Sequence, residues 1–285
     1  MFKMSNWTVV TGFFELPDKG SGYSLDKYKE GSKFTLDLDV NMVIYCDCSL
    51  IEYITEERSK FKGRTKIYPM KIADLPYSNY VENIEKNRKE KYPNGYPDQR
   101  NTSWYFILTM SKFTLLRMAI EENSFKSSHF AWIDFKYSQN DAKSKLLYEA
   151  LQCNRDLFSC CLIDYYPKKI AVDQPQIFYQ FGGPCTVAAG FFTAKKEIML
   201  KIIQLMDMEF LSVIRKKYGH AEQQLMYVLL LKYPELFDFY VGDYPCLLLN
   251  YVKPVDMSTV TSFLIPHILF YGDQELYERV KSKLI

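Results

Sequence analysis

The chain has 285 residues, of which 48% are hydrophobic and 25% charged, and these fractions exclude disordered, collagen-like and low-complexity proteins. Its 36 basic and 34 acidic residues leave a formal charge of +2, too balanced for a protein that grips a nucleic-acid backbone. The seven cysteines form no Cys-x-x-Cys pair, so we expect buried free thiols rather than a zinc ribbon or a thioredoxin-type site.

Along the chain, apolar strand patterns alternate with helical patterns, which predicts an α/β fold with a mostly parallel sheet. In the first half, strands are predicted at 7–14, 41–46, 66–70 and 128–135, and helices at 24–34, 51–60, 80–91 and 101–122. In the second half, the patterns indicate a strand at 157–164, a glycine-rich segment at 180–192, helices at 195–217 and 221–232, a strand pair at 239–251, an apolar run at 263–270, and a closing helix at 274–284.

The length of the apolar segments indicates the cellular location to expect. The longest stretches, around 185–194 and 225–231, fall short of the ~20 residues that span a bilayer. The first residues carry neither a long apolar segment nor a small-residue cleavage site. We therefore expect a cytoplasmic protein without a transmembrane segment, for which peripheral membrane contact stays open.

Common nucleotide-binding and hydrolase signatures are missing. The first strand is followed by neither the GxGxxG turn of dinucleotide-binding proteins nor a GxxxxGK[ST] phosphate loop. The chain also lacks GxSxG and HExxH. Rossmann oxidoreductases, P-loop enzymes, serine hydrolases of the α/β type and zincins are therefore disfavoured.

Two charged residues interrupt apolar patterns in the first half. Asp134 ends an apolar strand, where a carboxylate can hold a divalent cation or a ribose hydroxyl, or can cap a turn. Lys112 interrupts the apolar face of the helix at 101–122, so it either extends to the surface or directs a buried charge at an anion such as a diphosphate.

Three further features follow in the second half. Gly182 and Gly183, with Gly190, permit close approach of a ligand to the backbone, but they also suit tight turns. Glu222 opens a helix, where a carboxylate complements the helix dipole or serves catalysis. His267 lies in an apolar run, where a histidine is more often a satisfied core residue than a ligand.

In this order, the strand-end aspartate, glycine segment, helix-opening glutamate and late histidine resemble GT-A-type nucleotide-sugar glycosyltransferases. A closer resemblance is to the bacterial HtrL/YibB (WlaTC-like) family, which is regarded as GT-A-like. The similar segments are TVVTGFF, NMVIYCD, WYFILTMSKFTLL, FAWIDF, GGPCTVAAGFF and AEQQLMYVLLLKYPELFDFYVGDY, which together spread over most of the chain.

The resemblance implies one GT-A-like domain over 1–285, with a nucleotide-sugar-binding half at about 1–135 and an acceptor-binding half at about 136–285. It implies a glycosyltransferase of the hexosyltransferase type that moves sugar from a nucleoside-diphosphate sugar, such as a UDP-sugar, to a glycan, lipid-linked glycan or protein. Thr11, Phe13, Lys112, Asp134, Gly182 and Gly183 would then bind the donor.

The resemblance further implies Mn²⁺ or Mg²⁺ held by Asp134 with His267, and Glu222 as the general base if the reaction inverts the anomeric carbon. The chain departs from the family pattern of paired aspartates, because Trp132 and Lys136 flank Asp134 and a full DxD motif is absent. Two alternatives remain at this point: a sugar nucleotidyltransferase, and a catalytically inactive glycosyltransferase fold that serves as a binding module.

Overall fold

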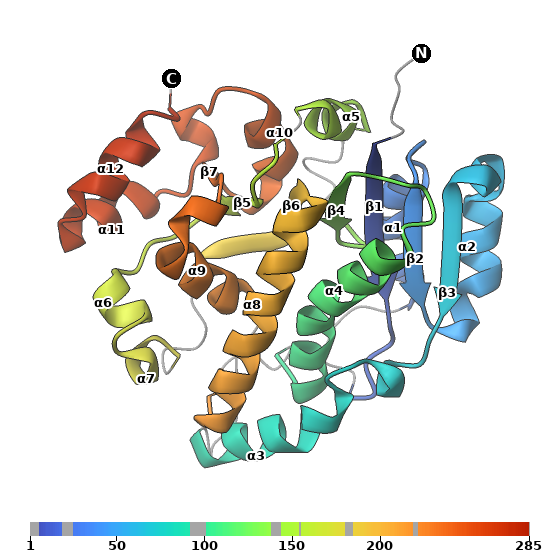
Figure 1. Cartoon of the computed structure of the whole chain (residues 1–285), viewed down its shortest axis with the longest axis horizontal. Coiled ribbons are helices and arrows are strands. Elements are labelled where there is room, and N and C mark those ends of the chain that lie inside the picture. The colour runs from blue at the N-terminus through green and yellow to red at the C-terminus, as the bar shows by residue number, and fades with distance from the viewer. Residues whose placement is uncertain are drawn as a thin grey trace.

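The protein folds around one mixed β-sheet (Figure 1). The structure, a computed structural model, describes residues 6–18, 25–91, 101–137, 144–153, 155–179, 185–218 and 222–284. Within these ranges seven strands pair in the order β3-β2-β1-β4-β6-β5-β7, and β6 is the strand that runs antiparallel to its neighbours. The strands are β1 (Trp7–Phe13), β2 (Met42–Cys46), β3 (Thr65–Pro69), β4 (His129–Ile133), β5 (Ser159–Leu162), β6 (Val187–Lys195) and β7 (Tyr240–Val241).

Helices cover both faces of the sheet, so the predicted class, an α/β fold with a mixed and mostly parallel sheet, is confirmed. One face carries α3, α4, α8 and α9, and Figure 1 shows α4 and α8 side by side. The other face carries α1, α2, α5 and α10. The helices are α1 (Leu25–Leu36), α2 (Ile51–Glu57), α3 (Val81–Lys91), α4 (Ser103–Glu122), α5 (Ser144–Gln152), α6 (Lys168–Ala171), α7 (Pro175–Phe178), α8 (Lys196–Arg215), α9 (Glu222–Lys232), α10 (Leu247–Val252), α11 (Leu264–Tyr271) and α12 (Gln274–Lys281).

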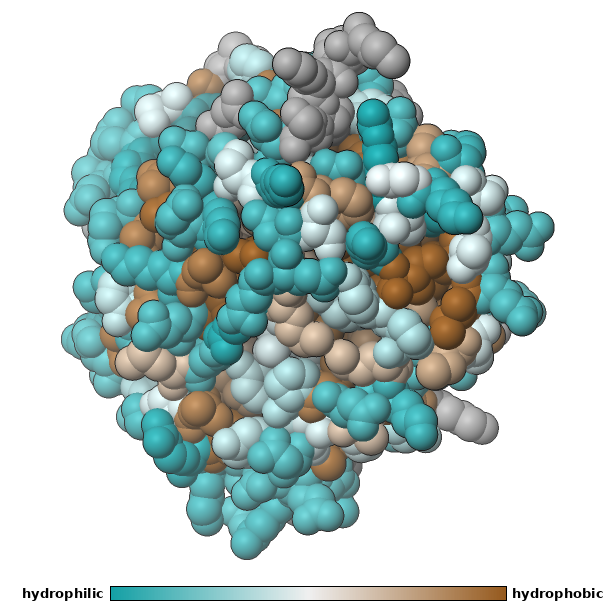
Figure 2. All heavy atoms as spheres, turned by 45° about the vertical axis from the view of Figure 1, so that its right-hand side comes forward, coloured by the Kyte–Doolittle hydropathy of each residue, from teal (hydrophilic) through white to brown (hydrophobic). Residues whose placement is uncertain are grey.

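Alternating strand residues divide the core into two layers. On β1, Val9 packs into the layer beneath α1 and α5, whereas Val10 packs into the layer beneath α4. Successive side chains of a strand point to opposite faces, and both faces here are covered, so a strand with mostly apolar residues on both faces is expected. On the face of the molecule seen in Figure 2, hydrophilic side chains predominate and the apolar areas are separated from one another.

The strand directions bring three chain segments to one edge of the sheet. β1 and β4 are parallel neighbours, so both end at the carboxyl edge. Because β6 runs the other way, it begins at that edge. The backbone N–H of Asp134, the first residue after β4, donates to the carbonyl of Gly190 on β6 at 2.9 Å.

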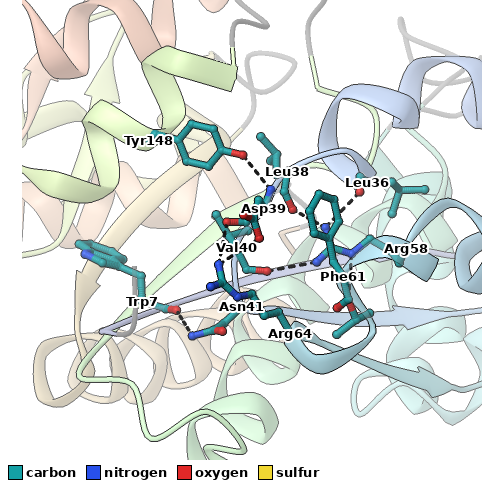
Figure 3. Close-up of polar contacts among 11 residues, drawn as sticks. Trp7, Leu36, Leu38, Asp39, Val40, Asn41, Arg58, Phe61, Arg64 and Tyr148 are labelled. Atoms are coloured by element: carbon teal, nitrogen blue, oxygen red, sulfur yellow. Dashed lines mark hydrogen bonds and ion pairs between the residues drawn. The ribbon is translucent and has the colours of Figure 1, made fainter. Parts of the chain in front are cut away.

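At the opposite edge, a buried arginine holds the segment that connects α1 to β2 (Figure 3). The guanidinium of Arg58 donates to the carbonyl oxygens of Leu36 (3.0 Å), Leu38 and Val40 (3.1 Å), and its Nε–H donates to Thr65 Oγ1 at 3.0 Å. Burial lowers the pKa of Arg58 to about 10, so the side chain remains charged at neutral pH. A single side chain therefore supplies the hydrogen-bond donors for three turn carbonyls.

Two expectations from the sequence are wrong. The predicted strand pair at 239–251 contains only the two-residue strand β7, followed by a 3₁₀ turn at Tyr244–Cys246 and helix α10. Pro245 lies in that turn and cannot donate to a strand ladder, which ends the strand pattern early. The thiols are all free, but Cys48, Cys153 and Cys185 are exposed rather than buried. Among the described helices, none is both long and apolar enough to cross a membrane.

Candidate functional site

A cavity of about 840 Å³ lies at the carboxyl ends of β1 and β4. Open α/β sheets bind their ligands outside the carboxyl ends of the strands, so a site is expected at this edge. The walls come from the end of β1, the start of α1, one side of α4, and the end of β4. The lining residues are Gly12, Phe13, Phe14, Glu15, Leu16, Pro17, Leu25, Tyr28, Tyr105, Leu108, Thr109, Lys112, Trp132, Asp134, Phe135 and Lys136.

Asp134 is fixed in the cavity wall by its neighbours. The indole N–H of Trp132 donates to Asp134 Oδ1 at 2.7 Å, a contact that is available because residues two apart on a strand share a face. Gly190 packs beside the other carboxylate oxygen, since a Cβ there would lie 3.5 Å from Asp134 Oδ2. The indole of Trp132 thus orients the Asp134 carboxylate.

Lys112 reaches the same carboxylate from α4. Its Nζ lies 2.9 Å from Asp134 Oδ1, 2.9 Å from Glu222 Oε1 and 3.1 Å from the carbonyl oxygen of Ala189. Burial alone would lower the pKa of Lys112, but the two carboxylates outweigh burial and raise that pKa above its ordinary value. Lys112 is therefore a buried ammonium, which agrees with the second of the two interpretations from the sequence, a buried charge, and not with a side chain that extends to the surface.

Glu222 completes this charged cluster from the first turn of α9. It is only 2% exposed, and its Oε1 takes the Lys112 contact while its buried Oε2 has no hydrogen-bond partner among the described residues. Two carboxyl groups therefore share the one ammonium of Lys112. A buried carboxylate oxygen without a donor is costly, so it marks a position where a hydroxyl could bind.

The segment after β1 closes the cavity on another side. The backbone N–H of Glu15 donates to Asp47 Oδ2 at 2.6 Å, which ties this segment to the end of β2. Burial raises the pKa of Asp47, although the hydrogen bond from Glu15 opposes that rise. Of the two predicted donor-binding residues on β1, Phe13 lines the cavity, whereas Thr11 is buried within the sheet and its hydroxyl has no hydrogen-bond partner in the described part of the chain.

His267 lies elsewhere on the carboxyl edge. It belongs to α11, and its Nδ1 is 2.7 Å from Oδ1 of Asp164, which follows β5. It does not line the cavity around Asp134. Within the described ranges, no group of three or more His, Cys, Asp or Glu side chains is placed to hold a metal ion. The structure thus brings Lys112, Asp134 and Glu222 together and leaves His267 with another partner.

The predicted donor-binding pair Gly182 and Gly183 lies outside the described residues. Sequence reasoning missed the aromatic residues Tyr28, Tyr105 and Phe135, which line the cavity. Phe135 directly follows the strand-end aspartate, so the sequence itself places it beside the expected site. The two tyrosines lie on helices, and only the packing of those helices against the sheet shows that they reach the site.

The family of the chain follows from its sequence. Residues 5–249 match the family described as "Bacterial protein of unknown function (HtrL_YibB)". The chain belongs to the HtrL/YibB family. The predicted family is therefore confirmed, and the cavity and the charged cluster lie within the matched region of this HtrL/YibB protein. No curated protein matches the sequence.

Among solved structures, this HtrL/YibB protein is distantly similar to several transferases. Mouse xyloside xylosyltransferase 1 is 10% identical at a TM-score of 0.43, covering 82% of this chain and 84% of that one. Core-mannan synthase A from Aspergillus fumigatus, in its Mn/GDP form, is 10% identical at 0.47, covering 85% and 76%. The 4-diphosphocytidyl-2C-methyl-D-erythritol synthase from Anaerococcus prevotii is 8% identical at 0.40, covering 95% and 96%.

Proposed function

We propose that this HtrL/YibB protein is a glycosyltransferase that moves a sugar from a nucleoside-diphosphate sugar to a hydroxyl of a glycan-type acceptor. The observation that carries the proposal is the cluster of Lys112, Asp134 and Glu222 beside an aromatic cavity at the carboxyl edge of the sheet. The cavity, at about 840 Å³, falls within the range of roughly 300–1,000 Å³ that is typical of small-molecule sites.

The aromatic wall suits a nucleobase. The ring centroids of Phe13 and Tyr28 are 4.6 Å apart and those of Phe13 and Phe135 are 5.3 Å apart, so three rings lie together. Stacking of a base on such a ring stabilises a complex by ~1–3 kcal/mol and tolerates any base. This arrangement supports a nucleotide as the ligand and leaves the identity of its base open.

The charged side chains suit the diphosphate. Lys112 and Lys136 both line the cavity, and a fixed cation stabilises a diphosphate leaving group as its negative charge grows. Asp134 holds the Lys112 ammonium in position from the cavity side. We assign Lys112 and Lys136 to the diphosphate, and Asp134 to the orientation of Lys112 and of donor hydroxyls.

The free oxygen of Glu222 suits the acceptor. In an inverting transfer, the acceptor oxygen bonds to the anomeric carbon, the bond from that carbon to the phosphate oxygen breaks, and its electron pair leaves with the nucleoside diphosphate. The proton of the acceptor hydroxyl must pass to a base. Glu222 Oε2 is desolvated and carries no donor in the described structure, so we assign it this role.

Ligand-induced thermal stabilisation and product analysis test the proposal. UDP and GDP at millimolar concentration should raise the melting temperature, while inorganic phosphate should not. A ligand at a hundred times its Kd adds ~2.7 kcal/mol to the free energy of unfolding. The matching sugar nucleotide should slowly release nucleoside diphosphate in water. If no nucleoside diphosphate raises the melting temperature, the protein has no donor site of this kind. Release of pyrophosphate from a nucleoside triphosphate and a sugar phosphate would instead identify a nucleotidyltransferase.

A matched pair of tyrosine variants locates the binding. Tyr28→Ala removes a cavity ring and should weaken nucleoside-diphosphate binding about 5- to 150-fold, the equivalent of ~1–3 kcal/mol of stacking. Tyr277→Ala removes a half-buried ring from α12, outside the cavity, and should leave the affinity unchanged. Equal affinities of the two variants would place the nucleotide somewhere other than this cavity.

A further inference from the structure

The ammonium of Lys112 lies inside a cage of three oxygens. Its partners are the carboxylate that follows β4, a carboxylate of α9 and a backbone carbonyl of β6: Asp134 Oδ1, Glu222 Oε1 and Ala189 O. A lysine ammonium has three N–H donors, so these contacts use all of them. Carboxylate and carbonyl oxygens are also the ligands that divalent cations take in proteins. The Lys112 ammonium thus occupies a position that is surrounded by oxygen ligands of the kind a divalent cation binds.

A divalent ion at Asp134 would have to share the carboxylate with this cation. Asp134 Oδ1 already accepts hydrogen bonds from Lys112 and from the indole of Trp132, and the flanking position 136 is a lysine. A metal ion bound by Asp134 would face the Lys112 ammonium at short range, and like charges repel strongly where water is excluded. Lys112 is only 8% exposed, and any movement of its ammonium away from this position would break its contacts with Asp134, Glu222 and the Ala189 carbonyl.

We infer that the donor site works without a divalent cation, because the Lys112 ammonium takes the place of the metal between Asp134 and Glu222. The inference rests on the proposed function and changes its chemistry: no metal ion holds the diphosphate. Because its three N–H groups are already used, Lys112 acts on the diphosphate through its charge alone, and Lys136 is the second cation of the cavity wall.

Nucleotide binding to the wild-type protein gives the first test. Isothermal titration with UDP and with GDP is run once in EDTA and once in Mn²⁺. The Kd should differ by less than about twofold between the two conditions. Binding that is more than tenfold tighter in Mn²⁺, or that is lost in EDTA, overturns the inference and leaves the proposed function standing. No binding in either condition overturns both.

The metal alone gives a second test that needs no nucleotide. Lys112→Ala removes the ammonium and leaves the three oxygens, so Mn²⁺ or Ca²⁺ should raise the melting temperature of this variant, and methylammonium should raise it as well. Neither metal should raise the melting temperature of the wild type. The control Lys201→Ala, which removes an exposed lysine of α8, should behave as the wild type does.

Stabilisation of the wild type by Mn²⁺ alone would show that a metal site coexists with Lys112, and would overturn the inference. If Lys112→Ala does not fold, the comparison of EDTA with Mn²⁺ on the wild-type protein still decides the question. A response of Lys112→Ala to methylammonium and to Mn²⁺, with none in the wild type, supports the cage as the position of the site's cation.

Discussion

Replacing Arg58 by lysine tests how the segment between α1 and β2 is held. The guanidinium reaches the carbonyl oxygens of Leu36, Leu38 and Val40, and its Nε–H reaches Thr65. An ammonium keeps the charge but is compact, so it cannot follow the spread of these acceptors and leaves about two buried carbonyls without a donor. Each unsatisfied buried group costs ~1–3 kcal/mol. We expect Arg58→Lys to lower the free energy of unfolding by about 3 kcal/mol.

Arg64→Lys is the matched control, drawn beside Arg58 in Figure 3. Arg64 forms a surface ion pair with Asp39 at 3.0 Å, its side chain is 47% exposed, and such pairs contribute ~0–1 kcal/mol. Urea denaturation should show a lower midpoint with an unchanged slope for Arg58→Lys and almost no change for Arg64→Lys. The melting temperature should fall by roughly 5 °C for the first variant. Equal stabilities of the two variants would show that the hydrogen bonds from Arg58 to these carbonyl oxygens do not stabilise the fold.

Three further predictions concern the site. Glu222→Gln retains a hydrogen-bond acceptor for Lys112 but removes the basic carboxylate, so kcat should fall about 10²–10⁴-fold while nucleotide affinity is preserved. If Glu222 only complements the helix dipole, the variant should instead lose ~0.3–1 kcal/mol of stability and keep a normal kcat. Measuring kcat and the melting temperature on one sample distinguishes the two roles. Asp134→Asn should lower kcat by about 10²–10³-fold with the fold intact. Asp164→Asn, which alters the partner of His267, should leave kcat unchanged. Equal losses of kcat for the two variants in steady-state assays would contradict the role assigned to Asp134. Burial raises the pKa of Asp47 in the folded protein, so the ionised carboxylate opposes folding. Asp47→Asn should therefore become more stable relative to the wild type as the pH rises above about 4. A stability difference between the two proteins that does not change with pH would contradict the raised pKa.

The sequence by itself determined the fold class and the strands and long helices of the first half. A strand buried on both faces is mostly apolar on both. A long helix that contacts several elements is apolar on most sides. Residues 7–14 and 101–122 could therefore be assigned from their local pattern. The observed elements are β1 (Trp7–Phe13) and α4 (Ser103–Glu122). The pattern failed at 239–251, where an apolar run is equally consistent with a short strand and a buried helix.

The sequence also pointed to the charged residues of the site without joining them. Lys112 breaks an apolar helix face, Asp134 ends an apolar strand, and Glu222 opens a helix, and each of these positions has a local explanation that requires no partner. Nothing in local periodicity says that a lysine inside α4 faces the end of β4 rather than the solvent.

Only the tertiary structure decided which residues meet. The parallel pairing of β1 with β4, the reversal of β6 and the packing of α4 and α9 against that face bring Lys112, Asp134 and Glu222 within hydrogen-bond distance, while α11 carries His267 to Asp164 instead. A charge buried at such a junction has to find its partners across long separations in sequence, because no neighbour on its own element can neutralise it. The pairing of Lys112 with two carboxylates is therefore a property of the packing.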